Sequence, residues 1–269
     1  MASGPLHPPG MTATLAAARL TPPDGRCRRA RVPLADGART TVYVACHDAA
    51  RTEIRVAVLP GQQRLEAWCA ARGVQEALVG GFFTRPDGLP LGEVRTGGVE
   101  RRHAPFDPPW HAVRSCVHVE GGTARLARRD ALPEVPRGDL LQAGPMLVAG
   151  GAVVFDRDAD TEGFRAGAHQ FDPDITDGRH PRAALGLAAG RILAVATDGR
   201  GTDDSGLTLG ELAGLMRDLG CEHALNLDGG GSTTLISGGM LRNLPRGDWE
   251  TPEPGGRPIS TALLFVPRD

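Results

Sequence analysis

The chain has 269 residues, enough to bury a substantial core in one large domain or two small ones. Its 30 basic and 32 acidic residues give a formal net charge of −2, so no field of one sign is available to attract a nucleic acid or an anionic membrane. All the basic residues are arginine, which excludes a Schiff-base lysine, a phosphate-loop lysine and a Ser/Lys dyad.

The five cysteines are far apart and form no CxxC pair or zinc spacing, so we expect reduced thiols. Residues 1–30, with many prolines and glycines, predict a flexible leader, and residues 31–269 one domain whose compact part starts near Val32. No signal-peptide pattern precedes it, so the chain as given is expected in the cytoplasm, with export left open if translation starts elsewhere. No stretch is long and apolar enough to span a bilayer.

Short β-type runs alternate with few helical segments along the first half of the chain. Val- and Ile-rich runs predict strands, and paired glycines between two such runs predict hairpin turns. The expected elements are strands at Thr41–Ala45, Ile54–Leu59 and Ala77–Phe83, a helix over Gln62–Arg72 that ends at Gly73, and strand pairs in Val113–Leu126 and Leu140–Val154.

The second half predicts a hairpin, one helix and a strand. Ala183–Thr197 reads as a hairpin about Gly190, and Ala224–Leu227 as an apolar strand. A helix over Thr208–Leu219 is indicated by the capping-box order Thr208-x-x-Glu211 and by Gly220 after its end. This pattern favours an α+β single domain with a largely antiparallel mixed sheet and a few packed helices.

The segment NLDGGGST (residues 226–233) carries the strongest chemical signal. Strand alternation would place Asn226 and Asp228 on one face, with Leu227 on the other. The three glycines remove side-chain bulk, so their N–H groups could approach an anion, with hydroxyl donors from Ser232 and Thr233.

A tight turn capped by Asp228 is the alternative interpretation of this segment. We favour a functional one, because a turn needs only one or two glycines. An asparagine on an apolar strand also costs free energy unless it is hydrogen-bonded or used, and Asn226 is one of only two asparagines in the chain.

Three further residues are candidates on their own chemistry. Asp198 follows an apolar strand, where reactive carboxylates are common, although Asp-Gly is also a common turn. Arg182 could hold a phosphate or carboxylate bidentately, or be a surface arginine with a packed stem. Glu211 is expected to support the site through the capping box.

An ordered set of motifs resembles the phosphodiester glycosidase family over roughly Ala77 to Val266. The set is GGFF, QAGPMLV, HPRAALG, VATDG, GLTLGELAGLM, ALNLDGGGSTT and GRPISTALLFV. The resemblance matches family motif positions at Arg182, Asp198, Glu211, Asn226, Asp228, Gly229, Gly230, Gly231 and Ser232, and Arg257 fits the GRP segment. Many members have an asparagine where this chain has Val79.

The resemblance implies a hydrolase that cleaves a sugar 1-phosphodiester. A phosphate monoester is a good leaving group, so one carboxylate can suffice where most glycosidases use a pair. Asp228 or Asp198 would be the base or nucleophile, with Asn226 and Arg182 completing the catalytic set. The residues predicted to bind substrate are the three glycines, Ser232, Thr233, Arg257 and His180.

Other polar segments are weaker candidates. Asp156, Asp158 and Asp160 have calcium-loop spacing but lack the EF-hand glycine and glutamate. The loop His169–His180 could line the substrate mouth or contribute metal ligands, and Trp249 could belong to a lid over the site. No cofactor is assigned; a divalent cation, calcium or magnesium, is left open, as is the oligomeric state.

Two rival functions remain beside the glycosidase. A non-catalytic glycan- or phosphate-binding protein would retain the pocket, and Val79 favours it. A nucleotide-binding enzyme using GGGST as its phosphate loop ranks last, because the lysine and the strand–loop–helix context are missing. The expected partner is therefore a carbohydrate or sugar-phosphate substrate, with neither nucleic acid nor membrane.

Overall fold

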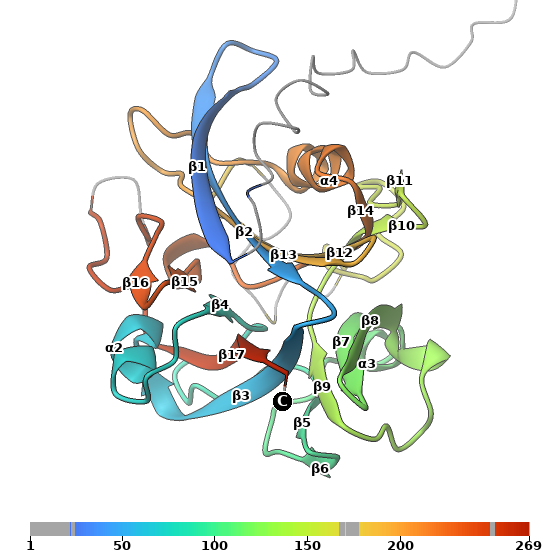
Figure 1. Cartoon of the computed structure of the whole chain (residues 1–269). Helices are drawn as coiled ribbons and strands as arrows, with labels where there is room; N and C mark the ends of the chain where they lie inside the picture. The colour runs from blue at the N-terminus through green and yellow to red at the C-terminus, as the bar shows by residue number, and fades with distance from the viewer. Residues whose placement is uncertain (1–21, 23–24, 167–169, 171–177, 248–250, 269) are drawn as a thin grey trace, which may run out of the picture.

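Three antiparallel sheets form the framework of this computed structural model, which describes residues 22, 25–166, 170, 178–247 and 251–268 (Figure 1). The largest sheet has seven strands. In spatial order they are β1 (Arg26–Pro33), β2 (Arg39–Asp48), β13 (Arg191–Thr197), β12 (Ala183–Ala188), β14 (Cys221–Asn226), β10 (Met146–Ala149) and β11 (Ala152–Val153).

Two five-stranded sheets complete the fold. One has the order β16 (Met240–Leu241), β15 (Leu235–Ser237), β4 (Ala77–Val79), β17 (Ile259–Pro267) and β3 (Thr52–Gln63). The other has the order β6 (Val99–Glu100), β5 (Val94–Thr96), β9 (Asp139–Gln142), β7 (Ser115–Glu120) and β8 (Thr123–Arg128). The described α-helices are α2 (Leu65–Ala70), α3 (Trp110–Val113) and α4 (Leu209–Asp218).

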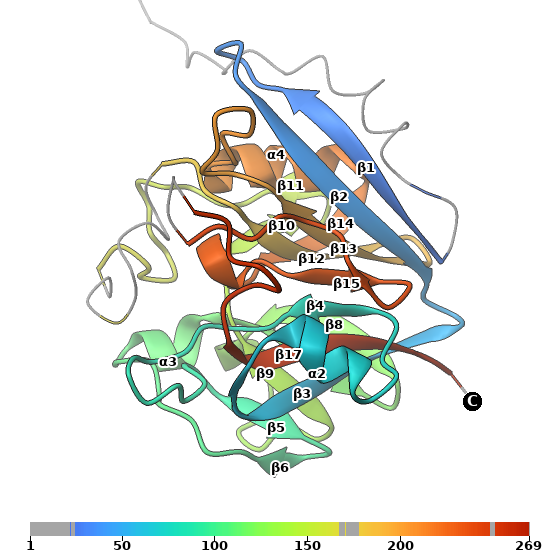
Figure 2. The same cartoon turned by 90° about the vertical axis from the view of Figure 1, so that its left-hand side faces the viewer.

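The seven-stranded sheet is buried on both faces. On β2, Val42 and Val44 pack in the core that contains the apolar face of α4, whereas Tyr43 and Ala45 pack toward the two smaller sheets. Figure 2 shows α4 on one side of this sheet and β4, β17 and β9 on the other. The alternation of β2 therefore separates the two largest of the four hydrophobic clusters in the described residues.

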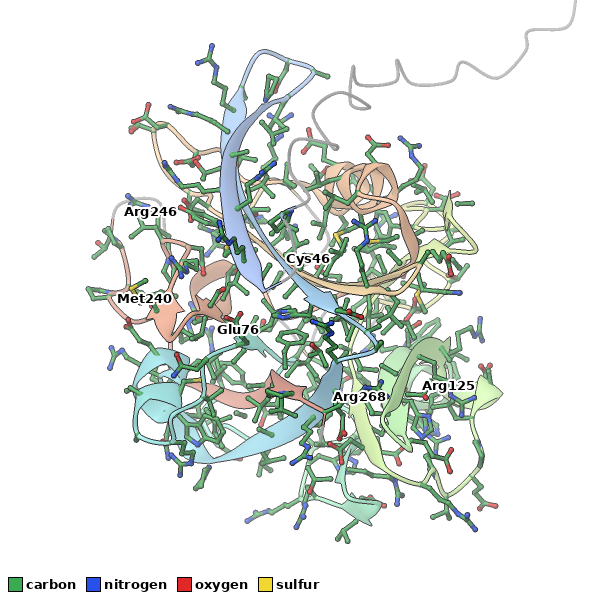
Figure 3. All side chains as sticks on the ribbon, in the orientation of Figure 1. Cys46, Glu76, Arg125, Met240, Arg246 and Arg268 are labelled. Carbon is green, nitrogen blue, oxygen red and sulfur yellow. The ribbon has the colours of Figure 1, made fainter. Side chains whose placement is uncertain are left out.

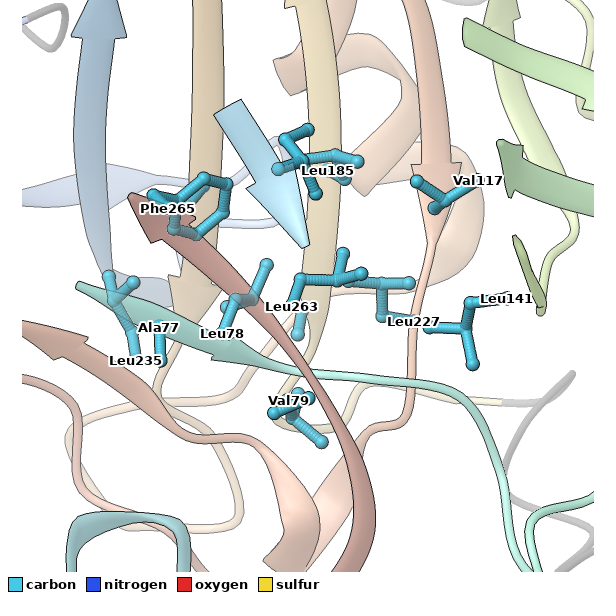
Figure 4. Packing of buried hydrophobic residues seen from close by; sticks show 14 of the residues in the cluster. Ala77, Leu78, Val79, Val117, Leu141, Leu185, Leu227, Leu235, Leu263 and Phe265 are labelled. Atoms are coloured by element: carbon cyan, nitrogen blue, oxygen red, sulfur yellow. The ribbon is translucent and has the colours of Figure 1, made fainter. Parts of the chain in front are cut away.

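The larger core joins all three sheets. Leu185 of β12, Leu263 of β17 and Leu141 of β9 are among its fully buried members, together with Leu227 from the NLDGGGST segment (Figure 4). Val79 also packs here with no exposed surface. The position where many family members have asparagine thus holds a core side chain.

The structure confirms the α+β prediction and several of its elements. All three predicted strand pairs contain a hairpin: β7–β8 about Gly121-Gly122, β10–β11 about Gly150-Gly151 and β12–β13 about Gly190. Helix α4 begins after Thr208, and both hydrogen bonds of its capping box are present. Among the described residues no helix has the length and apolar character needed to cross a membrane.

Three predicted boundaries are wrong. Gln62 and Gln63 belong to β3 rather than to a helix, because β3 continues along β17 as far as the pairing of Gln63 with Ile259. Strand β1 begins at Arg26, before the predicted start near Val32, and it spans the leader boundary at residue 30 because it pairs with β2 throughout. The run Ala77–Phe83 stops being a strand after Val79.

Gly80 and Gly81, which follow β4, do not continue the predicted strand. Their backbone instead lies close to β17. Gly80 N donates to Thr261 O at 2.9 Å, and Gly81 N donates to Thr261 Oγ1 at 3.0 Å. Gly80 O accepts from Asp228 N at 3.0 Å. The glycine pair therefore ties β17 to the NLDGGGST segment.

Gly80→Ala should destabilise the protein by about 1–3 kcal/mol, because it overpacks a close backbone contact. A Cβ at this position would overlap Thr261 Oγ1 and lie 2.8 Å from Thr261 C and O. Gly214→Ala is the control, since a Cβ there meets nothing within 4 Å and should stabilise α4 by about 0.5–1 kcal/mol. Urea unfolding measures both, and equal free energies of unfolding for the two variants would contradict the assignment.

Candidate functional site

Four segments meet at the NLDGGGST segment, which runs from the end of β14 to the start of β15. Gly230 N donates to Pro181 O at 2.9 Å, which joins it to the segment before β12. Arg257 N donates to Gly231 O at 2.9 Å, which joins it to the loop of residues 243–258. The loop after β13 reaches the same place through Arg200.

Each glycine of Gly229–Gly231, called the triple glycine below, lies against a charged side chain. A Cβ on the first would be 4.0 Å from Arg182 Nη1, and one on the second 3.1 Å from Arg200 Nη1. A Cβ on the third would overlap Glu253 Oε2. Glycine at the second and third positions thus leaves room for Arg200 and Glu253, whereas a Cβ on the first would meet Pro181 O at 3.0 Å.

Two of the three N–H groups of the triple glycine, which the sequence predicts to be available to an anion, are already hydrogen-bonded within the protein. Gly229 N donates to Asp228 Oδ1 at 2.9 Å, and Gly230 N is taken by Pro181 O. Ser232 N and Thr233 N donate to carbonyls within the same turn. Positive charge at this point therefore comes from guanidinium groups more than from backbone N–H groups.

Buried polar atoms without a hydrogen bond gather on this segment. They are Asn226 Oδ1, Ser232 Oγ, Thr233 Oγ1 and, packed against the triple glycine, Glu253 Oε2. A buried polar atom left unpaired is costly and rare, so a group of them indicates a place where a ligand supplies the missing partners.

Asp228 is the partly exposed carboxylate at the start of the triple glycine. Burial raises its pKa from 3.8 to about 6, while the Ser232 hydroxyl, Arg257 and Arg85 favour the charged form and limit the rise. Ser232 Oγ makes no hydrogen bond of ordinary geometry, so its influence on Asp228 is that of a nearby dipole. Asp228 is therefore ionised at neutral pH but titrates close to it.

Arg182 is a buried cation with only 2% of its surface exposed. Its Nε donates to Leu207 O at 3.0 Å and its Nη2 to Gly178 O at 3.3 Å. Burial lowers the pKa of the guanidinium to about 10, which still leaves it charged at neutral pH. The alternative interpretation of Arg182 as a surface arginine is thus wrong.

Arg200 is a site residue that the sequence analysis missed. Its backbone has a φ of +54°, unusual for a residue other than glycine, and its side chain is buried. Arg200 Nε donates to His180 Nδ1 at 3.1 Å, so the neutral imidazole carries its proton on Nε2. Arg200 Nη1 also donates to Gly247 O and, at 3.5 Å, to the carbonyl of Arg246, which Figure 3 labels.

Asp198 has both carboxylate oxygens engaged by the protein. The Tyr43 hydroxyl donates to Oδ2 at 2.9 Å, and Leu244 N donates to Oδ1 at 2.6 Å. Burial raises its pKa to about 6, against these two hydrogen bonds that favour the charged form. In this arrangement Asp198 anchors the start of the loop 243–258 to β2.

Both asparagines also form hydrogen bonds with the backbone. Asn226 Nδ2 donates to Gly144 O at 2.9 Å, and Asn243 connects Thr233 O and Leu235 N across the segment after the triple glycine. Strand β14 ends at Asn226, so the alternation expected to pair Asn226 with Asp228 does not continue to Asp228.

Glu211 has the supporting position predicted for it. Besides the capping box, it accepts from Arg179 with both carboxylate oxygens, and Arg179 in turn bridges to Asp36. Burial would raise the pKa of Glu211, but the hydrogen bonds from Arg179 and Thr208 outweigh it and lower the pKa. This network holds the residue that precedes His180.

The acidic loops have no metal-binding geometry in the part of the chain that the structure describes. Asp156 Oδ1 accepts from the N–H groups of Asp158 and Ala159, and Asp160 accepts from those of Arg165 and Ala166. No three His, Cys, Asp or Glu side chains in this part are grouped to hold an ion. His169, Asp172, Asp174, Asp177 and Trp249 lie outside the described residues.

A model of the phosphodiester glycosidase family matches residues 72–266. The chain belongs to this family. Its matched range begins ahead of β4 and ends in β17, so it contains every segment that meets at the triple glycine.

Solved structures agree on the fold. The zebrafish N-acetylglucosamine-1-phosphodiester alpha-N-acetylglucosaminidase catalytic domain, auto-inhibited by its pro-peptide, is similar with a TM-score of 0.66 at 21% identity, over 90% of this chain and 83% of that one. A hypothetical protein from Synechocystis has a TM-score of 0.61 at 20% identity, over 90% of this chain and 62% of that one. At these identities the likeness concerns the fold.

One curated relative matches a shorter stretch. The SPbeta prophage-derived uncharacterized protein YomE of Bacillus subtilis (strain 168) is 37% identical over 71 residues. That stretch is 26% of this chain and 11% of the relative, so the chain spans only a small part of that protein's length.

Asp228→Asn should raise the free energy of unfolding at pH 8 by about 2 kcal/mol and much less at pH 4. The raised pKa means that the folded state holds the proton more tightly than the unfolded chain does, so ionisation costs stability as pH rises from about 4 to above 6. Urea unfolding at both pH values measures this. Asp158→Asn is the control, because the Asp158 side chain is 96% exposed. If Asp228→Asn raised the free energy of unfolding equally at both pH values, the raised pKa of Asp228 would be contradicted.

Proposed function

We propose that this protein is a glycoside hydrolase that cleaves the bond between an anomeric carbon and a phosphodiester oxygen. The observation that carries the proposal is the convergence of Asp228, Arg182 and Arg200 on the triple glycine, beside buried polar atoms that lack partners. Family membership supports the same reaction class. A sugar 1-phosphodiester supplies both kinds of group that such a site can bind, an anion and several hydroxyls.

The two arginines would receive the phosphate. Guanidinium groups bind phosphate oxygens through charge-assisted, often bidentate, hydrogen bonds. Their charge is held next to the glycine backbone, where it would stabilise the negative charge that develops on the departing group. His180, hydrogen-bonded to Arg200, would fix the orientation of that guanidinium.

Asp228 would be the reacting carboxylate. The bond from the anomeric carbon to the phosphate oxygen breaks, and its electron pair leaves with the phosphate monoester. A water oxygen bonds to the anomeric carbon, with Asp228 either taking the water proton or first attacking the carbon itself. We prefer Asp228 to Asp198 for this role, because both Asp198 oxygens already accept hydrogen bonds from the protein.

Turnover of a panel of sugar 1-phosphodiesters and aryl glycosides tests the proposal. The panel includes an N-acetylglucosamine 1-phosphodiester, the linkage named for the zebrafish relative. We expect release of a phosphate monoester, and a loss of about 10²–10⁴-fold in kcat/KM for Asp228→Asn. Asp158→Asn should keep full activity, and no turnover of any phosphodiester would contradict the proposal.

The acid limb of the pH–rate profile should have an apparent pKa of about 6, because either role of Asp228 needs its ionised form. Activity therefore falls as the pH falls through 6. Arg85→Gln should shift this limb to higher pH, since the charge of Arg85 lowers the Asp228 pKa. A limb that stays near pH 4 in the wild type would rule out Asp228 as the titrating group.

A non-catalytic glycan- or phosphate-binding protein is the second candidate. The observation favouring it is Val79, which is fully buried in the core and so contributes no polar group beside Gly80. Such a protein would bind the phosphodiester saturably without forming product, and isothermal titration run beside the turnover assay separates the two candidates.

A further inference from the structure

Glu253 lies against the triple glycine at Gly231, and its carboxylate has the opposite charge to the two arginines. The proposed reaction does not use this residue. Its backbone is held in the loop 243–258, because Glu253 N donates to Pro245 O at 2.9 Å and Gly256 N donates to Glu253 O at 2.8 Å. The position of its carboxylate is thus set by an ordered turn.

The carboxylate of Glu253 fills the space of side chains at two glycines. A Cβ on Gly231 would overlap Oε2 and lie 3.0 Å from Cδ, and a Cβ on Gly247 would lie 2.8 Å from Oε1 and 3.1 Å from Cδ. Glycine at both positions therefore makes room for this one carboxylate between the triple glycine and the segment that carries Gly247.

Among the residues that the structure describes, none donates a hydrogen bond to Glu253 Oε2, although this atom is buried. The nearest described cation is Arg257, whose Nε is 3.9 Å away, within ion-pairing range but too far for a hydrogen bond. The positive charge of Arg257 also lowers the pKa of Asp228, so this one guanidinium acts on both carboxylates. An oxygen that can only accept hydrogen bonds thus lies against Gly231, three residues after Asp228.

We propose that Glu253 binds a hydroxyl group of the sugar, and that the triple glycine is divided into a phosphate-binding side at Gly229–Gly230 and a sugar-binding side at Gly231. The phosphate side carries Arg182 and Arg200, whereas the sugar side carries the Glu253 carboxylate, which accepts from hydroxyls and has its charge partly balanced by Arg257 at 3.9 Å. This inference rests on the proposed function and adds the residue that selects the glycosyl group.

Binding of two probes to wild type and Glu253→Gln tests the inference. Glucose 1-phosphate carries hydroxyls and phosphate, whereas phenyl phosphate carries the phosphate without sugar hydroxyls. We expect Glu253→Gln to weaken glucose 1-phosphate about ten-fold, because a hydrogen bond to a charged acceptor is roughly twice as strong as a neutral one, and to leave phenyl phosphate unchanged or slightly tighter.

Glu53→Gln is the matched control, since Glu53 is a partly exposed carboxylate paired with an arginine, Arg55, on β3. It should change neither affinity. The inference is overturned if Glu253→Gln leaves glucose 1-phosphate binding unchanged, if it weakens both probes equally, or if the wild type does not bind glucose 1-phosphate. A selective loss in a protein that turns over no phosphodiester would uphold Glu253 as the sugar ligand and refute the hydrolase.

Discussion

The absence of side chains at Gly229–Gly231 is the constraint on which the site depends. Charged groups from three different loops approach the same short backbone, where a Cβ on Gly230 or Gly231 would crowd Arg200 or Glu253 and a Cβ on Gly229 would lie 3.0 Å from Pro181 O. The loops also contact one another, since Arg200 donates to His180 and to the carbonyl of Gly247. The backbone after β14 is the common surface, and β14 itself is fixed by pairing with β12 and β10 inside the seven-stranded sheet.

Buried polar residues around this surface hold the loops in place. Asp198 binds the backbone of Leu244, Asn243 binds the strand after the triple glycine, and Glu211 holds Arg179. Each satisfies backbone or guanidinium groups that would otherwise be buried without partners. Motif residues of the family thus serve two purposes in this chain, and only geometry separates those that hold loops from those left available to a substrate.

The sequence predicted the elements whose signals are local. The hairpins, the capped helix α4 and the NLDGGGST segment depend on turns, caps and alternation that lie within a few residues. It did not predict that β3 runs on through Gln63 or that Ala77–Phe83 breaks at Gly80, because both depend on β17, about two hundred residues away in the chain. Arg200 and Glu253 were missed for the same reason, since each is defined by the glycine it approaches.

The chain contains arginine but no lysine, and this determines how the charge of the site responds to pH. A lysine buried as deeply as Arg182 would tend to release its proton near neutral pH, whereas the guanidinium keeps its charge. Asp228, by contrast, changes charge close to pH 6. The fixed cations and the titrating carboxylate therefore give the site a net charge that becomes more positive on acidification. Its affinity for anions should increase over the same pH range in which the proposed cleavage reaction should slow.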